Sequence, residues 1–163
     1  MSSPADVRGG RSCVSRTVKS RLLGLGVTIV AVASMAGAAL AASTTIGTSK
    51  VTVHSKVETV VVDSSGVTLY TLSGETARHL KCVTSQCFVA WPPYKVSAAA
   101  KLSKASGITG TLSKLHRVKG KFYQLMLNGH PLYRFAGDKG KRGSAVGDGI
   151  TSFGGVWHVV AAT

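Results

Sequence analysis

Two tyrosine-acid pairs are the residues of this chain best suited to hold a proton, a cation or a small polar ligand. Each tyrosine precedes an acid by five positions, as Tyr70 with Glu75 and Tyr133 with Asp138. Phe135 shares a strand face with Tyr133, because side chains two positions apart in a strand point the same way. These five residues form the predicted ligand pocket.

The same residues also fit a structural role. In that interpretation the aromatic side chains and Leu69 and Leu132 fill a core, and each acid accepts hydrogen bonds from backbone N–H groups of the following turn. In the other interpretation, the tyrosines and acids of both pairs line one shared pocket at a pseudo-twofold axis. The two interpretations differ in whether these polar side chains reach a solvent-accessible cavity.

Cysteine and histidine supply a second candidate set. Cys82 and Cys87 are separated by four residues and are the cysteines that remain beyond the N-terminal leader, so a disulfide is expected in an oxidising compartment. With His79 they would alternatively offer copper or zinc three ligands. A structural zinc site needs four, and oxidation removes the thiolates. We therefore predict a disulfide, with no metal and no cofactor.

Signatures of catalysis are missing from the sequence. There is no Gly-x-Ser-x-Gly nucleophile elbow and no His-Glu-x-x-His metal motif. Residues 42–163 contain five acidic side chains in total, which leaves little material for a catalytic carboxylate pair. No residue is predicted to be catalytic, and the sequence favours a protein that is not an enzyme.

Both tyrosine-acid pairs follow predicted β-hairpins that are copies of one another. The first hairpin turns at 63–66 (Asp-Ser-Ser-Gly) between β-branched runs, and the second turns at an Asn-Gly pair at 128–129. A glycine, a Leu-Tyr pair, a large apolar residue, a second glycine and an acid recur in order without a gap. Each copy then continues to a tryptophan, Trp91 or Trp157. The sequence therefore predicts one unit written twice, about 63 residues apart.

The predicted fold is mainly β: a small antiparallel β domain of two tandem hairpin repeats, preceded by an N-terminal apolar helix. The predicted divisions are 1–42 (signal peptide or membrane anchor), 43–57 (linker and first strand, with a polar tether at 43–50), 58–94 (repeat 1), 95–107 (a connector, either a short helix or a loop) and 108–163 (repeat 2). Trp91 and Trp157 are predicted to be buried structural aromatics. An exposed Trp-Pro-Pro-Tyr segment at 91–94 would instead be an aromatic platform.

The leader has the residue order of a secretory signal. Five basic residues precede 22–42, where every residue is apolar, glycine, serine or threonine, and Ala39 and Ala41 frame a cleavage site. Residues 22–42 are also long enough to cross a bilayer as a retained anchor. The sequence predicts a secreted or extracytoplasmic protein, released by cleavage or anchored through 22–42.

The exported part is strongly basic. Residues 42–163 contain 15 Lys and Arg against five Asp and Glu. The basic residues are scattered singly, without the stripe and interleaved aromatics of a nucleic-acid interface, so no nucleic acid is predicted as a partner. Net charge of this kind favours anionic envelope polymers or a membrane surface. The sequence names no small ligand.

The chain resembles a bacterial family of exported proteins, the secreted-repeat or predicted-lipoprotein family, which is marked by a Tyr-x-aromatic-x-x-Asp motif. Tyr133, Phe135 and Asp138 match this motif, whereas the first copy has Leu72 and Glu75 in place of the aromatic residue and the aspartate. The resemblance spans about 58–161 and implies export and a tandem repeat. Members are commonly lipid-anchored, but no cysteine follows the cleavage site here.

The resemblance carries no established activity. Together with the residues, it predicts an exported cell-envelope protein of undetermined activity that acts as a non-enzymatic binding or structural module. The alternative is an accessory redox or metal-handling protein for copper or zinc.

Overall fold

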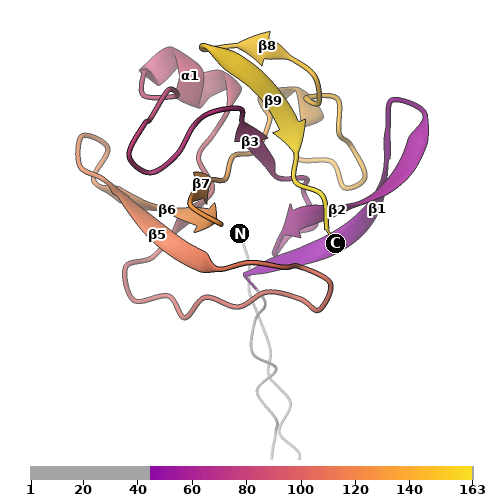
Figure 1. The fold of residues 1–163 in the computed structure, drawn as a ribbon, viewed down its shortest axis with the longest axis horizontal. Helices are drawn as coiled ribbons and strands as arrows, with labels where there is room; N and C mark the ends of the chain where they lie inside the picture. Colours follow the sequence, from indigo (N-terminus) through magenta and orange to yellow (C-terminus); the bar gives the residue numbers. More distant parts are fainter. Residues whose placement is uncertain (1–44, 163) are drawn as a thin grey trace, which may run out of the picture. The chain divides into compact units, whose positions relative to one another are not determined.

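A computed structural model describes residues 45–162, which form a mainly β domain (Figure 1). Its strands are β1 (Ile46–Val53), β2 (Lys56–Asp63), β3 (Tyr70–Leu72), β4 (Lys95–Val96), β5 (Leu112–Arg117), β6 (Phe122–Leu127), β7 (His130–Pro131), β8 (Thr151–Ser152) and β9 (Gly155–Val159). Its helical elements are α1 (Ser85–Ala90) and the 3₁₀ turn η1 (Ala136–Asp138). The predicted antiparallel β fold with little helix is confirmed. The predicted apolar helix falls within 1–42, outside the described residues.

In the structure, copy 1 runs from β1 to β4 and copy 2 from β5 to β9. Each copy opens with a two-stranded antiparallel hairpin, β1 with β2 and β5 with β6. The prediction of a tether at 43–50 was wrong for 46–50, because β1 begins at Ile46. Val51 and Val53 are buried while Thr52 between them is exposed, which is the alternation of a strand. Ile46, an odd number of positions away, is buried in a different cluster. His54 and Ser55 close this hairpin with positive φ angles of 44° and 68°.

The strand that ends each copy lies against the other copy. The Val61 N–H donates to the Val160 carbonyl at 2.7 Å, and the Leu125 N–H donates to the Tyr94 carbonyl at 2.9 Å. Val61 and Leu125 belong to the first hairpins of copies 1 and 2. Tyr94 immediately precedes β4, the final strand of copy 1, and Val160 immediately follows β9, the final strand of copy 2. The two copies therefore exchange their last strands, and neither hairpin completes its pairing within its own copy.

The two motif tyrosines mark the centre of this exchange. The Tyr70 N–H donates to the Tyr133 carbonyl at 2.8 Å, and the Tyr133 N–H donates back to the Tyr70 carbonyl at 2.9 Å. Beyond Tyr70 the order is β9, β2 and β1, and beyond Tyr133 it is β4, β6 and β5. The two series are equivalent, because each contains the final strand of the other copy followed by a hairpin. The pair thus lies on the pseudo-twofold axis that the duplicated sequence predicted.

The segment between the copies is a loop after β4, with no helix among residues 95–107. It returns to the first strand, since the Ala105 N–H donates to the Ile46 carbonyl at 3.0 Å. The six-residue α1, which the sequence did not predict, begins after Thr84, whose side-chain oxygen accepts from the Cys87 N–H. Across 45–162, none of the helices has the length and apolar character required to span a bilayer.

Candidate functional site

The tyrosine-acid pairs form between copies rather than within them. The Tyr70 hydroxyl donates to Asp138 Oδ2 at 2.7 Å, and Tyr133 lies beside Glu75, whose charge acts on its hydroxyl. All four side chains are at most 1 % exposed. The structure therefore brings the predicted residues together, but as packed pairs in the interior.

Burial keeps both tyrosines protonated. Desolvation is the largest cause that raises the pKa of Tyr70, and the hydrogen bond to Asp138 raises it further. Desolvation also raises the pKa of Tyr133, with the Glu75 charge acting in the same direction and the Arg117 charge opposing it. Each hydroxyl is therefore a permanent donor near neutral pH and cannot serve as a base.

The two acids organise the long loops that follow them. Glu75 Oε1 accepts from the N–H groups of Lys81 and Cys82, both at 2.9 Å, and Asp138 Oδ1 accepts from the Val146 N–H at 3.1 Å. Such bonds from charged acceptors are stronger than neutral ones. The structural role predicted for the acids is present in both copies. That these residues also bind a ligand stays a prediction.

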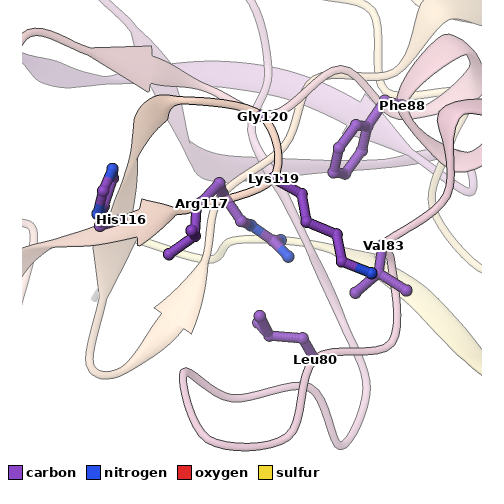
Figure 2. Close-up of a pocket in the computed structure, with 8 residues that line it drawn as sticks. Leu80, Val83, Phe88, His116, Arg117, Lys119 and Gly120 are labelled. Carbon is purple, nitrogen blue, oxygen red and sulfur yellow. The ribbon is translucent and has the colours of Figure 1, made fainter.

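A pocket of about 390 Å³ lies beside the buried pairs (Figure 2). Its lining comes from residues 76–90 of copy 1 and from the β5–β6 hairpin of copy 2. The lining residues are Leu80, Val83, Phe88, His116, Arg117, Val118, Lys119 and Gly120. None of the five residues of the predicted ligand pocket lines it.

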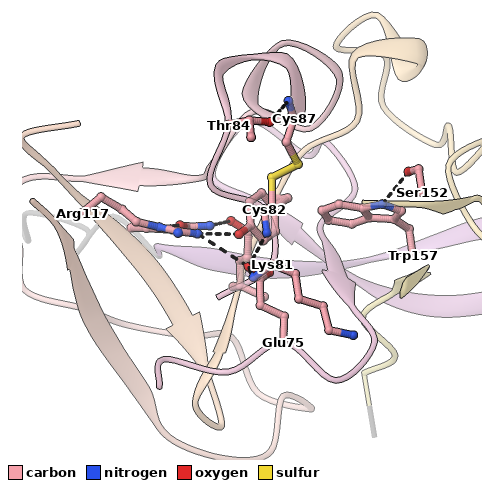
Figure 3. The surroundings of a disulfide bond; sticks show 11 residues. Glu75, Lys81, Cys82, Thr84, Cys87, Arg117, Ser152 and Trp157 are labelled. Carbon is pink, nitrogen blue, oxygen red and sulfur yellow. Dashed lines mark hydrogen bonds and ion pairs between the residues drawn. A yellow bond between two sulfur atoms is a disulfide. The ribbon is translucent and has the colours of Figure 1, made fainter. Parts of the chain in front are cut away.

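Arg117 connects this pocket to the buried pairs (Figure 3). Its Nε donates to Gln124 Oε1 at 2.7 Å, and its Nη2 donates to the Tyr133 hydroxyl at 2.5 Å and lies 4.0 Å from Glu75 Oε1. The side chain is buried. Sequence reasoning did not single out this residue, because it treated the scattered basic residues as one group. The signal was its position on the inward face of a strand.

The predicted disulfide between Cys82 and Cys87 is present and fully buried (Figure 3). Because the sulfurs are bonded to each other, they are not available to the alternative metal set with His79, which is exposed. Within residues 45–162, no three His, Cys, Asp or Glu side chains are grouped to hold a metal ion.

The two tryptophans meet at the same axis. Trp91 and Trp157 stack with their ring centroids 3.9 Å apart, and each also receives a tyrosine edge, Tyr70 on Trp91 and Tyr133 on Trp157. Phe135 stacks on Trp91 at 4.3 Å. Trp91 is 1 % exposed, so the segment 91–94 presents no tryptophan face for a platform.

The fold and the crossed pairs define a duplicated β domain whose copies complete each other. The family model that matches this chain is described as a secreted repeat of unknown function and covers residues 118–161. This segment runs from the β5–β6 turn through β9 and contains Tyr133, Phe135 and Asp138, so the family resemblance is confirmed there. The description agrees with an exported, extracytoplasmic protein of undetermined activity. No curated protein and no solved structure matched the chain.

Proposed function

We propose that the exported domain is a non-enzymatic binding module for anionic polymers of the cell envelope. The observation that carries this proposal is the separation of charge between interior and surface. Of the five acidic side chains in 45–162, Asp63, Glu75 and Asp138 are buried and Asp148 is 14 % exposed. Glu58 is the acid that remains fully on the surface of this part of the chain.

The buried acids already have partners inside the protein. Asp63 pairs with Arg134 and also accepts from the Ser65 and Val67 N–H groups. Glu75 and Asp138 hold their loops, as described above. Folding therefore removes negative charge from the surface, where the exposed basic side chains outnumber the exposed acids.

Eleven Lys and Arg residues of 45–162 are exposed, against the single exposed acid. They are Lys50, Lys56, Arg78, Lys95, Lys101, Lys104, Lys119, Lys121, Lys139, Lys141 and Arg142. An unbalanced surface of one sign attracts polyanions and raises their local concentration.

The placement of the cations favours a flexible polymer over a flat membrane. Lys56 follows the β1–β2 turn and Lys119 and Lys121 lie in the β5–β6 turn, and the two turns lie on opposite sides of the domain (Figure 1). A polymer chain can follow cations around the molecule, whereas a bilayer reaches one side at a time.

The test is binding of the full chain to a poly(glycerol phosphate) polymer, with dextran of similar length as the neutral control. We expect binding to the polyanion that weakens steeply between about 50 and 500 mM salt, as screening shortens the range of surface charges to a few ångströms. Replacing Lys139, Lys141 and Arg142 with glutamine should weaken binding, and a second triple at Lys56, Lys119 and Lys121 should weaken it comparably.

Two results would count against this proposal. Equal retention on dextran would show that charge is not the determinant. Stronger binding to vesicles with anionic lipid than to the polymer, at equal charge concentration, would make a membrane the partner instead.

A further inference from the structure

Each copy presents its hairpin to the long loop of the other copy, and the two resulting clefts differ. We call the contact between the β1–β2 hairpin and loop 139–150 the closed cleft, and that between the β5–β6 hairpin and loop 76–90 the open cleft. In the closed cleft, Val51 and Val60 pack in one cluster with Ala145. His54 Nε2 lies 3.0 Å from Asp148 Oδ2 across its edge. The open cleft contains the pocket of Figure 2.

Strand register identifies the side chains that make this difference. Val61 and Leu125 correspond, because each pairs with the final strand of the other copy, so Val60 corresponds to Gln124. Glu58 and Phe122 each lie three residues before the corresponding residues Val61 and Leu125. Val51 lies opposite Glu58 and Arg117 lies opposite Phe122, so Val51 corresponds to Arg117. The valines that fill the closed cleft are therefore replaced by Arg117 and Gln124 in the open cleft.

The open cleft combines apolar walls with two cations, Arg117, which also lies near the buried Glu75, and the exposed Lys119. Leu80, Val83 and Phe88 line it from the disulfide loop, and Val83 stays 55 % exposed. Figure 2 shows the Arg117 and Lys119 side chains extending into the space between these walls. No acidic side chain is among the lining residues.

Arg117 is held in place before any ligand arrives. Gln124 and the Tyr133 hydroxyl fix two of its nitrogens, and its guanidinium lies 5.6 Å from the centre of the Phe88 ring. Preorganised charge costs little reorganisation on binding. A volume of about 390 Å³ falls in the range of small-molecule sites.

We propose that the open cleft is a binding site for a small anionic amphiphile, a molecule with one carboxylate on an apolar chain or ring. The apolar part lies against Leu80, Val83 and Phe88, and the carboxylate lies near Arg117 and Lys119. This inference does not depend on polymer binding, because it uses the apolar walls of one cleft and not the distributed surface charge.

Three eight-carbon probes test the proposal by isothermal titration with the full chain: octanoate, octanol and octylammonium. We expect octanoate to bind about two- to fivefold more tightly than octanol, because one partly exposed ion pair gives a preference of this size. Octylammonium should be weaker than both. Equal affinity for octanoate and octanol would overturn the proposal, since an unspecific apolar patch gives that result.

Variants then place the ligand. Val83→Asp sets a carboxylate in the pocket wall and should abolish octanoate binding, whereas Val57→Asp makes the same change at an exposed valine of the other hairpin and should leave it intact. Lys119→Gln should weaken octanoate binding a few-fold and leave octanol binding unchanged, with Lys119→Arg restoring it. Unchanged binding in Val83→Asp would place the ligand elsewhere and refute the site. Loss of octanoate binding with retained polyanion binding separates this proposal from the one above.

Discussion

The closed and open clefts occupy equivalent places in the two copies, yet one is packed with valines and the other contains an arginine. Val51 and Val60 pack with Ala145 in the first, whereas Arg117 and Gln124 form a hydrogen-bonded pair in the second. Duplication thus supplied a self-complementary scaffold, and a change of residue type at two equivalent positions gave one side of it a pocket.

The acids differ between the clefts in a matching way. Asp138, next to the closed cleft, is satisfied by neutral donors: the Tyr70 and Ser144 hydroxyls at 2.7 Å and the Val146 N–H. Glu75, next to the open cleft, has a guanidinium 4.0 Å away in addition to its backbone donors. The open cleft therefore rests on a buried ion pair that the closed cleft does not need.

Arg117→Met should have the largest effect on stability. It leaves Glu75 buried without its cation, and breaking a buried pair in this way costs about 3–5 kcal/mol. Chemical denaturation with urea measures the loss in the free energy of unfolding. The double variant Arg117→Met with Glu75→Gln should recover part of it, because the uncompensated charge is removed. A loss below about 1 kcal/mol in the single variant would show that the pair does not support the open cleft.

The tyrosine hydroxyls should have the next largest effect, and a nearly symmetric one. Tyr70→Phe removes a donor from Asp138, and Tyr133→Phe removes the acceptor of Arg117. Each change should cost about 1–3 kcal/mol, because a buried charged group loses a hydrogen bond. Tyr123→Phe, at a half-buried tyrosine of β6, is the control and should stay within about 0.5 kcal/mol. Markedly unequal losses in the free energy of unfolding would show that the two crossed pairs do not contribute equally to stability.

The sequence predicted the duplicated unit and suggested an axis between its copies, but it missed which tyrosine meets which acid there. Repeated Gly, Leu-Tyr and acid positions predicted the two turns at 63–66 and 128–129, which follow β2 and β6. The spacing of Cys82 and Cys87 predicted the disulfide. Local order pairs Tyr70 with Glu75, five residues away. The pairing of the Tyr70 and Tyr133 segments instead brings Asp138, 68 residues away, to the Tyr70 hydroxyl. Local periodicity cannot anticipate such a pairing, because it depends on which copy each final strand joins.

Two further misses have the same cause. Arg117 was not singled out, because the inward direction of its side chain depends on the register of β5 against β6. The serine, threonine and glycine at 46–50 suggested a tether, but pairing with β2 makes these residues a strand. Composition describes a segment alone, whereas both outcomes are set by its partner.

Alkaline pH tests the crossed pairs together. An unfolded tyrosine loses its proton near pH 10, whereas burial raises the folded pKa of Tyr70 and Tyr133 well above this value. The stability from both groups is therefore complete below about pH 10 and is lost as pH rises toward the folded pKa, by roughly 1 kcal/mol per tyrosine at one pH unit above the unfolded value. Urea midpoints between pH 8 and 11 measure the slope. Tyr70→Phe and Tyr133→Phe should each flatten it, and unaltered slopes would contradict the shifts.

The smallest effect is expected at the edge of the closed cleft. The β1–β2 hairpin extends to His54, which reaches Asp148 at 3.0 Å and is 69 % exposed. His54→Ala should cost about 0.2–1 kcal/mol, because a contact made by an exposed side chain contributes little. Amide hydrogen exchange should rise in β1 and β2 near the turn and stay constant in β5 and β6. Equal acceleration in both hairpins would mean that His54 acts on the whole domain, and the two clefts would then not be energetically separate.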